Sequence, residues 1–167
     1  MRAHIQYFNT VVRHKWFVFL ACFTMRVPLW RAIVHDLSKF TRREWFPYVH
    51  QFFNSDGTPR KVRDASGAYD PNAQSLDFKR AWLSHQRNPH HWQAHISIGD
   101  GGNLTALPMP ETYAREMVAD WIGAGKAYSG KSNPRGWYEQ NKDKMILHPD
   151  IRTMVEKLLS RLRDNAP

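Results

Sequence analysis

Apolar residues recur at steps of three and four along most of the chain, and this spacing constrains the fold more than any other feature. One series opens the chain and another closes it: Ile5, Phe8, Val12, Trp16, Phe19 and Phe23, then Ile151, Met154, Val155, Leu158, Leu159 and Leu162. Such spacing places side chains on one face of an α-helix, whereas a strand alternates every second residue. No segment alternates convincingly. The sequence therefore predicts an all-α, single-domain bundle of about six or seven helices over residues 1–167.

The first predicted helix carries a second apolar stripe at Val11, Val18 and Cys22, so we expect it to be buried on most sides. It also contains an uncharged run from Trp16 to Met25. That run is too short to cross a bilayer, which takes about 20 residues. We therefore expect no membrane partner. The single cysteine suits a reducing compartment, so the expected location is the cytoplasm, or the host cytoplasm if the chain is phage-encoded.

Capping signals set the boundaries of the next two helices. Pro28 can occupy an early helical position and begins a helix that runs to about Phe40. Thr41 and Glu44 have the spacing of a capping box, which opens a third helix. Pro47 lies inside this third helix and should kink or delay it.

Similar signals mark the later helices. Ser75 is the expected N-cap of a fourth helix, and Pro110 begins another that Gly123 or Gly125 should end. The C-terminal amphipathic helix is predicted over residues 149–164.

Two irregular stretches, residues 54–75 and residues 99–108, separate these helices. A loop as long as the first is typical of a lid or a binding loop. It contains a basic segment formed by Arg60, Lys61 and Arg63, which we expect either to close over substrate phosphates or to be a solvated loop.

The composition is that of a globular protein with an excess of positive charge. Hydrophobic residues make up 42%, which excludes a disordered chain. The 24 Lys and Arg against 15 Asp and Glu give a net charge of +9, which favours a polyanionic partner or a phosphorylated substrate. The single cysteine excludes an internal disulfide framework and suits a reducing compartment.

Nine histidines are many for 167 residues, and several of them cluster. His85, His90, His91 and His95 fall close together, and other candidates are His14 and the adjacent pair His35–Asp36. Glu116 and Asp120 are four residues apart and share a helix face. Imidazole and carboxylate groups together are the ligands of Fe, Mn, Ni or Zn, so a divalent transition metal is the expected cofactor.

The order His14, His35–Asp36, His85, His90–His91, Asp120 resembles the metal-binding order of the HD-domain superfamily of helical metal-dependent phosphohydrolases. The segment His35-Asp36-Leu37-Ser38-Lys39 is similar to the His-Asp-x-x-Lys form of its cyclic-dinucleotide phosphodiesterase branch, although the Gly-Tyr-Pro signature of that branch is absent. The resemblance implies an HD-like helical domain with two metal sites.

The resemblance also implies roles for single residues. His14, His35, Asp36 and Asp120 would hold one metal, and Asp36 would bridge to a second metal held by His85 and either His90 or His91. The catalytic residues would be Asp36, Lys39 and Glu116, with Glu116 as an extra ligand. Lys39, placed four residues after His35 on the same helix face, would contact the phosphoryl oxygens. Apart from the resemblance, the basic residues Arg60, Lys61 and Arg63 could close over the remaining phosphates if they are not simply a solvated loop.

The chain also looks like a small uncharacterised family found in phages and bacteria. The blocks that carry this likeness are His-Asp-x-Ser-Lys-Phe at residues 35–40, His-x-x-Asn-x-His-His at 85–91 and Glu-Met-x-x-Asp-Trp at 116–121. This second likeness implies no activity.

The leading expectation is a metal-dependent phosphohydrolase or phosphodiesterase that acts on a nucleotide or a related phosphate ester through metal-activated water. One alternative is an HD-type di-iron oxygenase, which uses the same residue types. Another is a basic nucleic-acid-binding protein without enzymatic activity, in which Trp82, Trp92 and Trp137 would stack on bases. The oligomeric state stays open.

Overall fold

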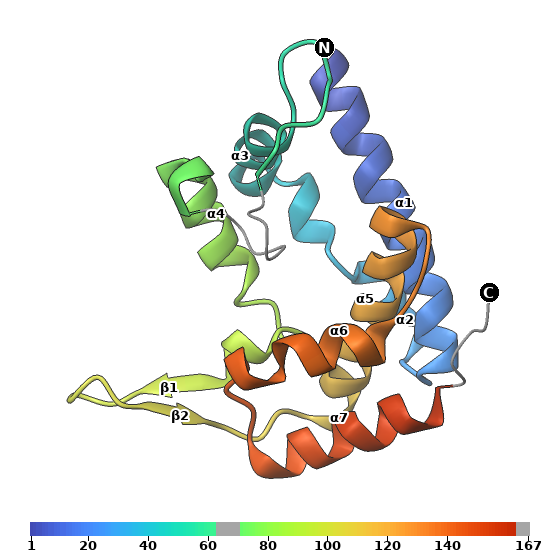
Figure 1. Cartoon of the computed structure of the whole chain (residues 1–167), viewed down its shortest axis with the longest axis vertical. Coiled ribbons are helices and arrows are strands. Elements are labelled where there is room, and N and C mark those ends of the chain that lie inside the picture. The colour runs from blue at the N-terminus through green and yellow to red at the C-terminus, as the bar shows by residue number, and fades with distance from the viewer. Residues whose placement is uncertain (63–70, 163–167) are drawn as a thin grey trace. The chain divides into compact units, whose positions relative to one another are not determined.

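The computed structural model describes residues 1–62 and 71–162 and is drawn in Figure 1. Over these residues the all-α prediction is confirmed, since the chain forms seven α-helices and one short antiparallel hairpin. The helices are α1 (Arg2–Thr24), α2 (Leu29–Val34), α3 (Arg42–Phe52), α4 (Leu76–His85), α5 (Glu111–Ser129), α6 (Pro134–Asn141) and α7 (Pro149–Arg161). Among the described helices, none combines the length and the hydropathy needed to cross a bilayer.

The chain groups into two compact units that alternate along the sequence. The first unit holds Met1–Arg13 and Asp36–Gln86, and the second holds His14–His35 and the residues from Arg87 onward. Helix α1 therefore contributes its first part to one unit and the remainder to the other.

In the first unit, the start of α1 packs with α3 and α4 around a small core. The buried apolar side chains of this core are Ala3, Tyr7, Val11, Tyr48, Val49, Phe78 and Ala81. Ser75 caps α4 as predicted, because its Oγ accepts a hydrogen bond from the N–H of Phe78 at 3.1 Å. Helix α3 begins at Arg42 and continues through Pro47, so the expected delay of this helix was wrong.

The predicted loop after α3 is only partly described. Asn54 and Thr58 close a turn through the hydrogen bond from the N–H of Asn54 to the carbonyl of Thr58. Phe53 and Pro59 form an isolated β-bridge across this turn. Arg63, one of the predicted phosphate-binding residues, lies outside the described residues.

In the second unit, the remainder of α1 packs with α5, α6 and α7 around the larger core. Helix α5 passes through Gly123 and Gly125 and ends at Ser129, with Gly130 as its C-cap at φ of +74°, so the predicted end was wrong. Gly123 is needed for packing, because a Cβ on it would lie 2.4 Å from Cγ2 of Val18 and 2.6 Å from its backbone nitrogen. The glycine thus permits close approach of α1 and α5.

Two elements of the second unit were not predicted. Helix α6 begins after Asn133, whose side chain accepts a hydrogen bond from the N–H of Gly136 at 2.8 Å. Strands β1 (Ile96–Ile98) and β2 (Leu104–Ala106) pair across the second irregular stretch and extend from the helices as a hairpin in Figure 1. The predicted C-terminal helix is present as α7, and His148 caps it with a side-chain nitrogen that accepts from the N–H of Asp150.

The first helix is not buried on most sides. Its most regular apolar series is largely solvent-exposed, with relative exposures between 44% and 58% at Ile5, Phe8, Val12, Trp16 and Phe23. The buried stripe is the second one, which includes Val11, Val18 and Cys22. The side chains of this second stripe are mostly smaller than those of the exposed series, and they allow neighbouring helices to approach closely, as Val18 and Gly123 show.

Candidate metal centre

The expected helix from Leu29 to Phe40 is broken at the His35–Asp36 pair. Helix α2 ends at Val34, His35 leaves the helical region with φ of −48° and ψ of 127°, and Asp36 adopts the left-handed region with φ of +55°. A short 3-10 turn, Leu37–Phe40, follows. The prediction that Lys39 shares a helix face with His35 was therefore wrong, and the two adjacent residues His35 and Asp36 belong to different units.

Three predicted ligands meet inside the second unit. Nε2 of His14 from α1 lies 3.3 Å from Oδ1 of Asp120 on α5. Nε2 of His35 lies 3.6 Å from the same oxygen. The two histidine side chains are almost fully buried, and that of Asp120 is mostly buried. One donor atom from each residue lies within 4.8 Å of the other two.

This separation fits a shared metal ion. Two ligand atoms that each lie ~2.1 Å from one ion are ~3.0–3.4 Å apart in octahedral or tetrahedral geometry. The observed 3.3 and 3.6 Å are close to those values. Two imidazoles and one carboxylate also form a donor set that suits Zn, Mn, Fe or Ni. The residues present therefore fit the expected cofactor.

Glu116 contacts the other ring nitrogen of His35, Nδ1. Nδ1 of His35 donates a hydrogen bond to Oε1 of Glu116 at 3.0 Å, and Nε and Nη2 of Arg31 each lie 2.7 Å from Oε2. Because Nδ1 carries the ring proton, Nε2 presents a lone pair on the side of Asp120. A carboxylate that orients a metal-binding histidine in this way is a recurrent feature of metal sites.

The pKa of Glu116 reflects this environment. Burial acts to raise the pKa, but the hydrogen bond from His35, the electrostatic effect of the neighbouring His90 and His35 rings and the hydrogen bond from Arg31 together lower it below its ordinary value. Glu116 is thus an ionised acceptor at neutral pH. Nδ1 of His90 lies 3.4 Å from Oε1 of Glu116, so His35, His90 and Glu116 form a second group that could hold an ion.

A similar arrangement exists within the first unit, around His85 at the end of α4. Nδ1 of His85 donates to Oε2 of Glu44 on α3 at 2.9 Å, and Nε2 lies 3.7 Å from Oδ1 of Asp36. The other oxygen of Asp36 is paired with Nζ of Lys39. All four side chains are buried. In both units, therefore, a histidine is held between a glutamate on Nδ1 and an aspartate on the side of Nε2.

Comparison with known proteins gives a family without a known activity. The model of a family of unknown function, DUF5662, matches residues 3–161. The chain belongs to this family. No curated protein and no solved structure matches the chain. All three sequence blocks noted above lie inside the region that matches DUF5662.

The remaining predicted residues of this DUF5662 protein fall into two groups. Of the paired histidines, His90 is buried beside Glu116, whereas His91 is only half-buried, and its ring is tilted by 44° to that of His90 with the centroids 4.3 Å apart. Arg60 and Lys61 are exposed on the first unit.

Two residues of these two clusters, around His35 and around His85, were not among the predicted site residues. Glu44 was assigned to a capping box, but its carboxylate accepts from His85, and the hydroxyl of Thr41 donates instead to the carbonyl of Ser38. Arg31 was not considered. A signal for both was present, because a histidine that binds metal commonly needs a carboxylate partner, and a buried carboxylate needs a cation.

Proposed function

We propose that this DUF5662 protein binds a divalent transition metal through His14, His35 and Asp120 and hydrolyses a phosphate ester, such as a nucleotide. The observation that carries the proposal is the convergence of three donor atoms from separate elements, two of them on buried imidazoles, on one point of the second unit. The order of these residues along the chain, which resembles that of HD-domain phosphohydrolases, and the net charge of +9 support the same reaction class.

The bound ion would supply a Lewis acid and a water molecule of lowered pKa. Residues of the chain would orient the ligands of this ion. Glu116 holds the proton on Nδ1 of His35, so that Nε2 remains a ligand, and Arg31 balances the charge of that glutamate. With three protein ligands, the ion would keep room for water and substrate, which is typical of catalytic metal sites.

The proposal extends to the second ion that the resemblance implies. His85 and Asp36 would be its ligands in the first unit, with Glu44 orienting His85. Lys39, which pairs with the other oxygen of Asp36, would contact a phosphoryl oxygen. We place the activity in the cytoplasm, because a single buried cysteine suits a reducing compartment.

Metal content is the direct test. The purified protein, Asp120→Asn and a control variant, His148→Asn, are compared by elemental analysis for Fe, Mn, Ni and Zn. We expect bound metal in the wild type and the control. Asp120→Asn should lose at least about tenfold in metal affinity, because even the loss of a group that only orients a ligand typically costs about 10–100-fold. His148→Asn keeps a side chain that can cap α7, so it tests for a general effect of removing a histidine.

Activity is then screened with nucleotides and cyclic dinucleotides by release of phosphate or of a linear product. Turnover that requires metal and is lost in Asp120→Asn supports the proposal. Iron-specific occupancy with oxygen consumption and no hydrolysis would favour the oxygenase alternative. Folded protein that neither contains metal nor takes it up on soaking contradicts both. Salt-sensitive nucleic-acid binding that survives Asp120→Asn would then favour the non-enzymatic alternative.

A further inference from the structure

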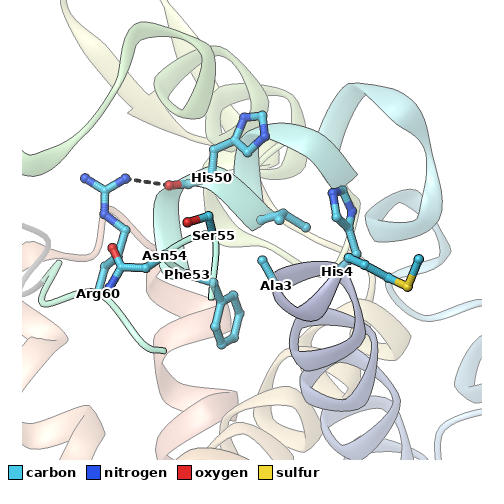
Figure 2. Close-up of a pocket in the computed structure, with 9 residues that line it drawn as sticks. Ala3, His4, His50, Phe53, Asn54, Ser55 and Arg60 are labelled. Atoms are coloured by element: carbon cyan, nitrogen blue, oxygen red, sulfur yellow. Dashed lines mark hydrogen bonds between the residues drawn. The ribbon is translucent and has the colours of Figure 1, made fainter. Parts of the chain in front are cut away.

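A pocket of about 410 Å³ lies in the first unit, between the start of α1 and the turn that follows α3 (Figure 2). Its volume is within the range of small-molecule sites. None of the residues proposed above as metal ligands is among its lining residues, so it is a separate candidate site. The lining residues are Met1, Ala3, His4, Val49, His50, Phe53, Asn54, Ser55 and Arg60.

The described lining of this pocket contains cationic groups and no acidic residue. Arg60 carries a permanent charge, and His4 and His50 offer ring nitrogens. In Figure 2, Arg60 and His4 lie on opposite sides of the pocket. A concave surface lined by one sign of charge attracts the opposite sign, so the pocket selects for an anionic ligand.

Arg60 is held in place at the edge of the pocket. Its Nη1 donates a hydrogen bond to the carbonyl of His50 at 2.6 Å, which Figure 2 draws as a dashed line. Its backbone N–H donates to the carbonyl of Phe52 at 2.8 Å. Because one bond anchors the guanidinium, less side-chain freedom is lost when its other N–H groups bind an anion. The planar fork of these groups matches the oxygens of a phosphate.

His4 is fixed as a hydrogen-bond donor. Nε1 of Trp45 donates to Nδ1 of His4 at 2.8 Å. The indole nitrogen can only donate, so Nδ1 of His4 carries no proton and the ring proton is on Nε2. His4 therefore adds a donor without needing to be charged.

The remaining lining offers an apolar surface. Ala3 and Val49 are buried, and the ring of Phe53 is half-buried beside them. We propose that this pocket binds a small molecule in which a phosphate monoester is attached to an aromatic ring. Arg60 contacts the phosphate, and Phe53 packs against the ring. The proposal does not rest on the metal centre.

Phenyl phosphate is the probe that tests this site. It is titrated into the full chain at constant ionic strength with a chelator present, so that no phosphate binds through metal, and the ring signals of His4 and His50 are followed by nitrogen-correlated NMR. We expect saturable shifts of both histidines. Arg60→Gln should weaken binding by about tenfold or more, the range expected for a lost charge-assisted hydrogen bond.

Lys61→Gln is the matched control, because Lys61 is the neighbouring exposed cation and does not line the pocket. It should change the affinity by less than about twofold. Equal losses in Arg60→Gln and Lys61→Gln would overturn the proposal, as would the absence of saturable shifts at millimolar probe. Benzyl alcohol or benzoate binding as tightly as phenyl phosphate would also overturn it. Asp120→Asn should bind phenyl phosphate like the wild type, because Asp120 does not line the pocket. A loss of binding in this variant would overturn the proposal of a separate site.

Discussion

Replacing Gly123 by alanine should separate α1 from α5 and destabilise the protein. The added Cβ would lie 2.4, 2.6 and 2.7 Å from Cγ2, the backbone nitrogen and Cα of Val18. Carbon atoms in favourable contact are ~3.5–4.0 Å apart, so the helices must move by about 1 Å. The clash involves backbone atoms, which cannot rotate away, so we take the upper end of the usual overpacking cost, ~3 kcal/mol.

Alanine also has the better helix propensity, by ~1 kcal/mol, which offsets part of this cost. The expected net loss in the free energy of unfolding is therefore about 2 kcal/mol, or roughly 4–8 °C in Tm for a chain of this size. Urea unfolding followed by circular dichroism measures the loss directly. Gly123→Ala with the stability of the wild type, or greater, would refute the packing argument.

The same variant should weaken metal binding if the proposed centre is correct. His14 lies one turn before Val18 on α1, and Asp120 lies almost one turn before Gly123 on α5. A shift of about 1 Å between these helices changes the 3.3 Å separation of Nε2 of His14 and Oδ1 of Asp120.

The control for both effects is Gly125→Ala, on the same helix. A Cβ there would lie 3.0 Å from the carbonyl of Lys131 and 3.3 Å from Cα of Ser132, which belong to a loop. A loop can yield by the few tenths of an ångström required, and alanine gains the same ~1 kcal/mol of helix propensity, so this variant should lose no stability relative to the wild type.

Three further predictions concern single side chains. Burial, together with the charges of Glu116 and Asp120, raises the pKa of the Cys22 thiol to about 12, so very little of it is thiolate near neutral pH. An aromatic disulfide reagent should therefore react at least ~100-fold more slowly with the native protein than with the unfolded protein. Glu44→Ala should cost ~1–3 kcal/mol in urea unfolding, because it removes the acceptor of a buried His85 donor. Ser75→Ala should cost ~1 kcal/mol in the same assay, because α4 loses its N-cap.

Each of these has an outcome that contradicts it. The labelling rate of native Cys22 should rise as the pH approaches the raised pKa. Rapid labelling near neutral pH would contradict the prediction, because it would mean that the thiol is accessible. Glu44→Gln keeps an acceptor oxygen, so it should lose less stability than Glu44→Ala; equal losses would mean that the bond to His85 contributes little. Ser75→Thr, which can also cap a helix, should stay close to the wild type.

The sequence predicts where helices lie along the chain better than it predicts which face of a helix is buried. Helical spacing and caps locate α1, α4 and α7, because these signals are local. The face that α1 buries was not predictable, because both of its faces are apolar and the residue that selects one of them, Gly123, is distant in the sequence. Gly123 itself was misinterpreted as a helix end, since the need for close packing is invisible in the local pattern.

The candidate site, too, could be predicted only in part from the sequence. The order of residues along the chain pointed to His14, His35 and Asp120, and the structure brings these three side chains together. The break at Asp36 was not predictable, since spacing says nothing of a left-handed backbone at a non-glycine residue. Glu44 was missed because a capping box accounted for it from nearby residues alone, whereas its partner His85 is far along the chain.

The alternating order of the two compact units has a consequence for dissecting this protein. The chain passes between them after Arg13, after His35 and after Gln86, and the first of these crossings falls inside α1. No continuous fragment contains one unit whole without a piece of the other, so truncation cannot isolate either unit. Point variants, or a circular permutation that leaves every helix uncut, are the appropriate tools for assigning a property to one half of the molecule.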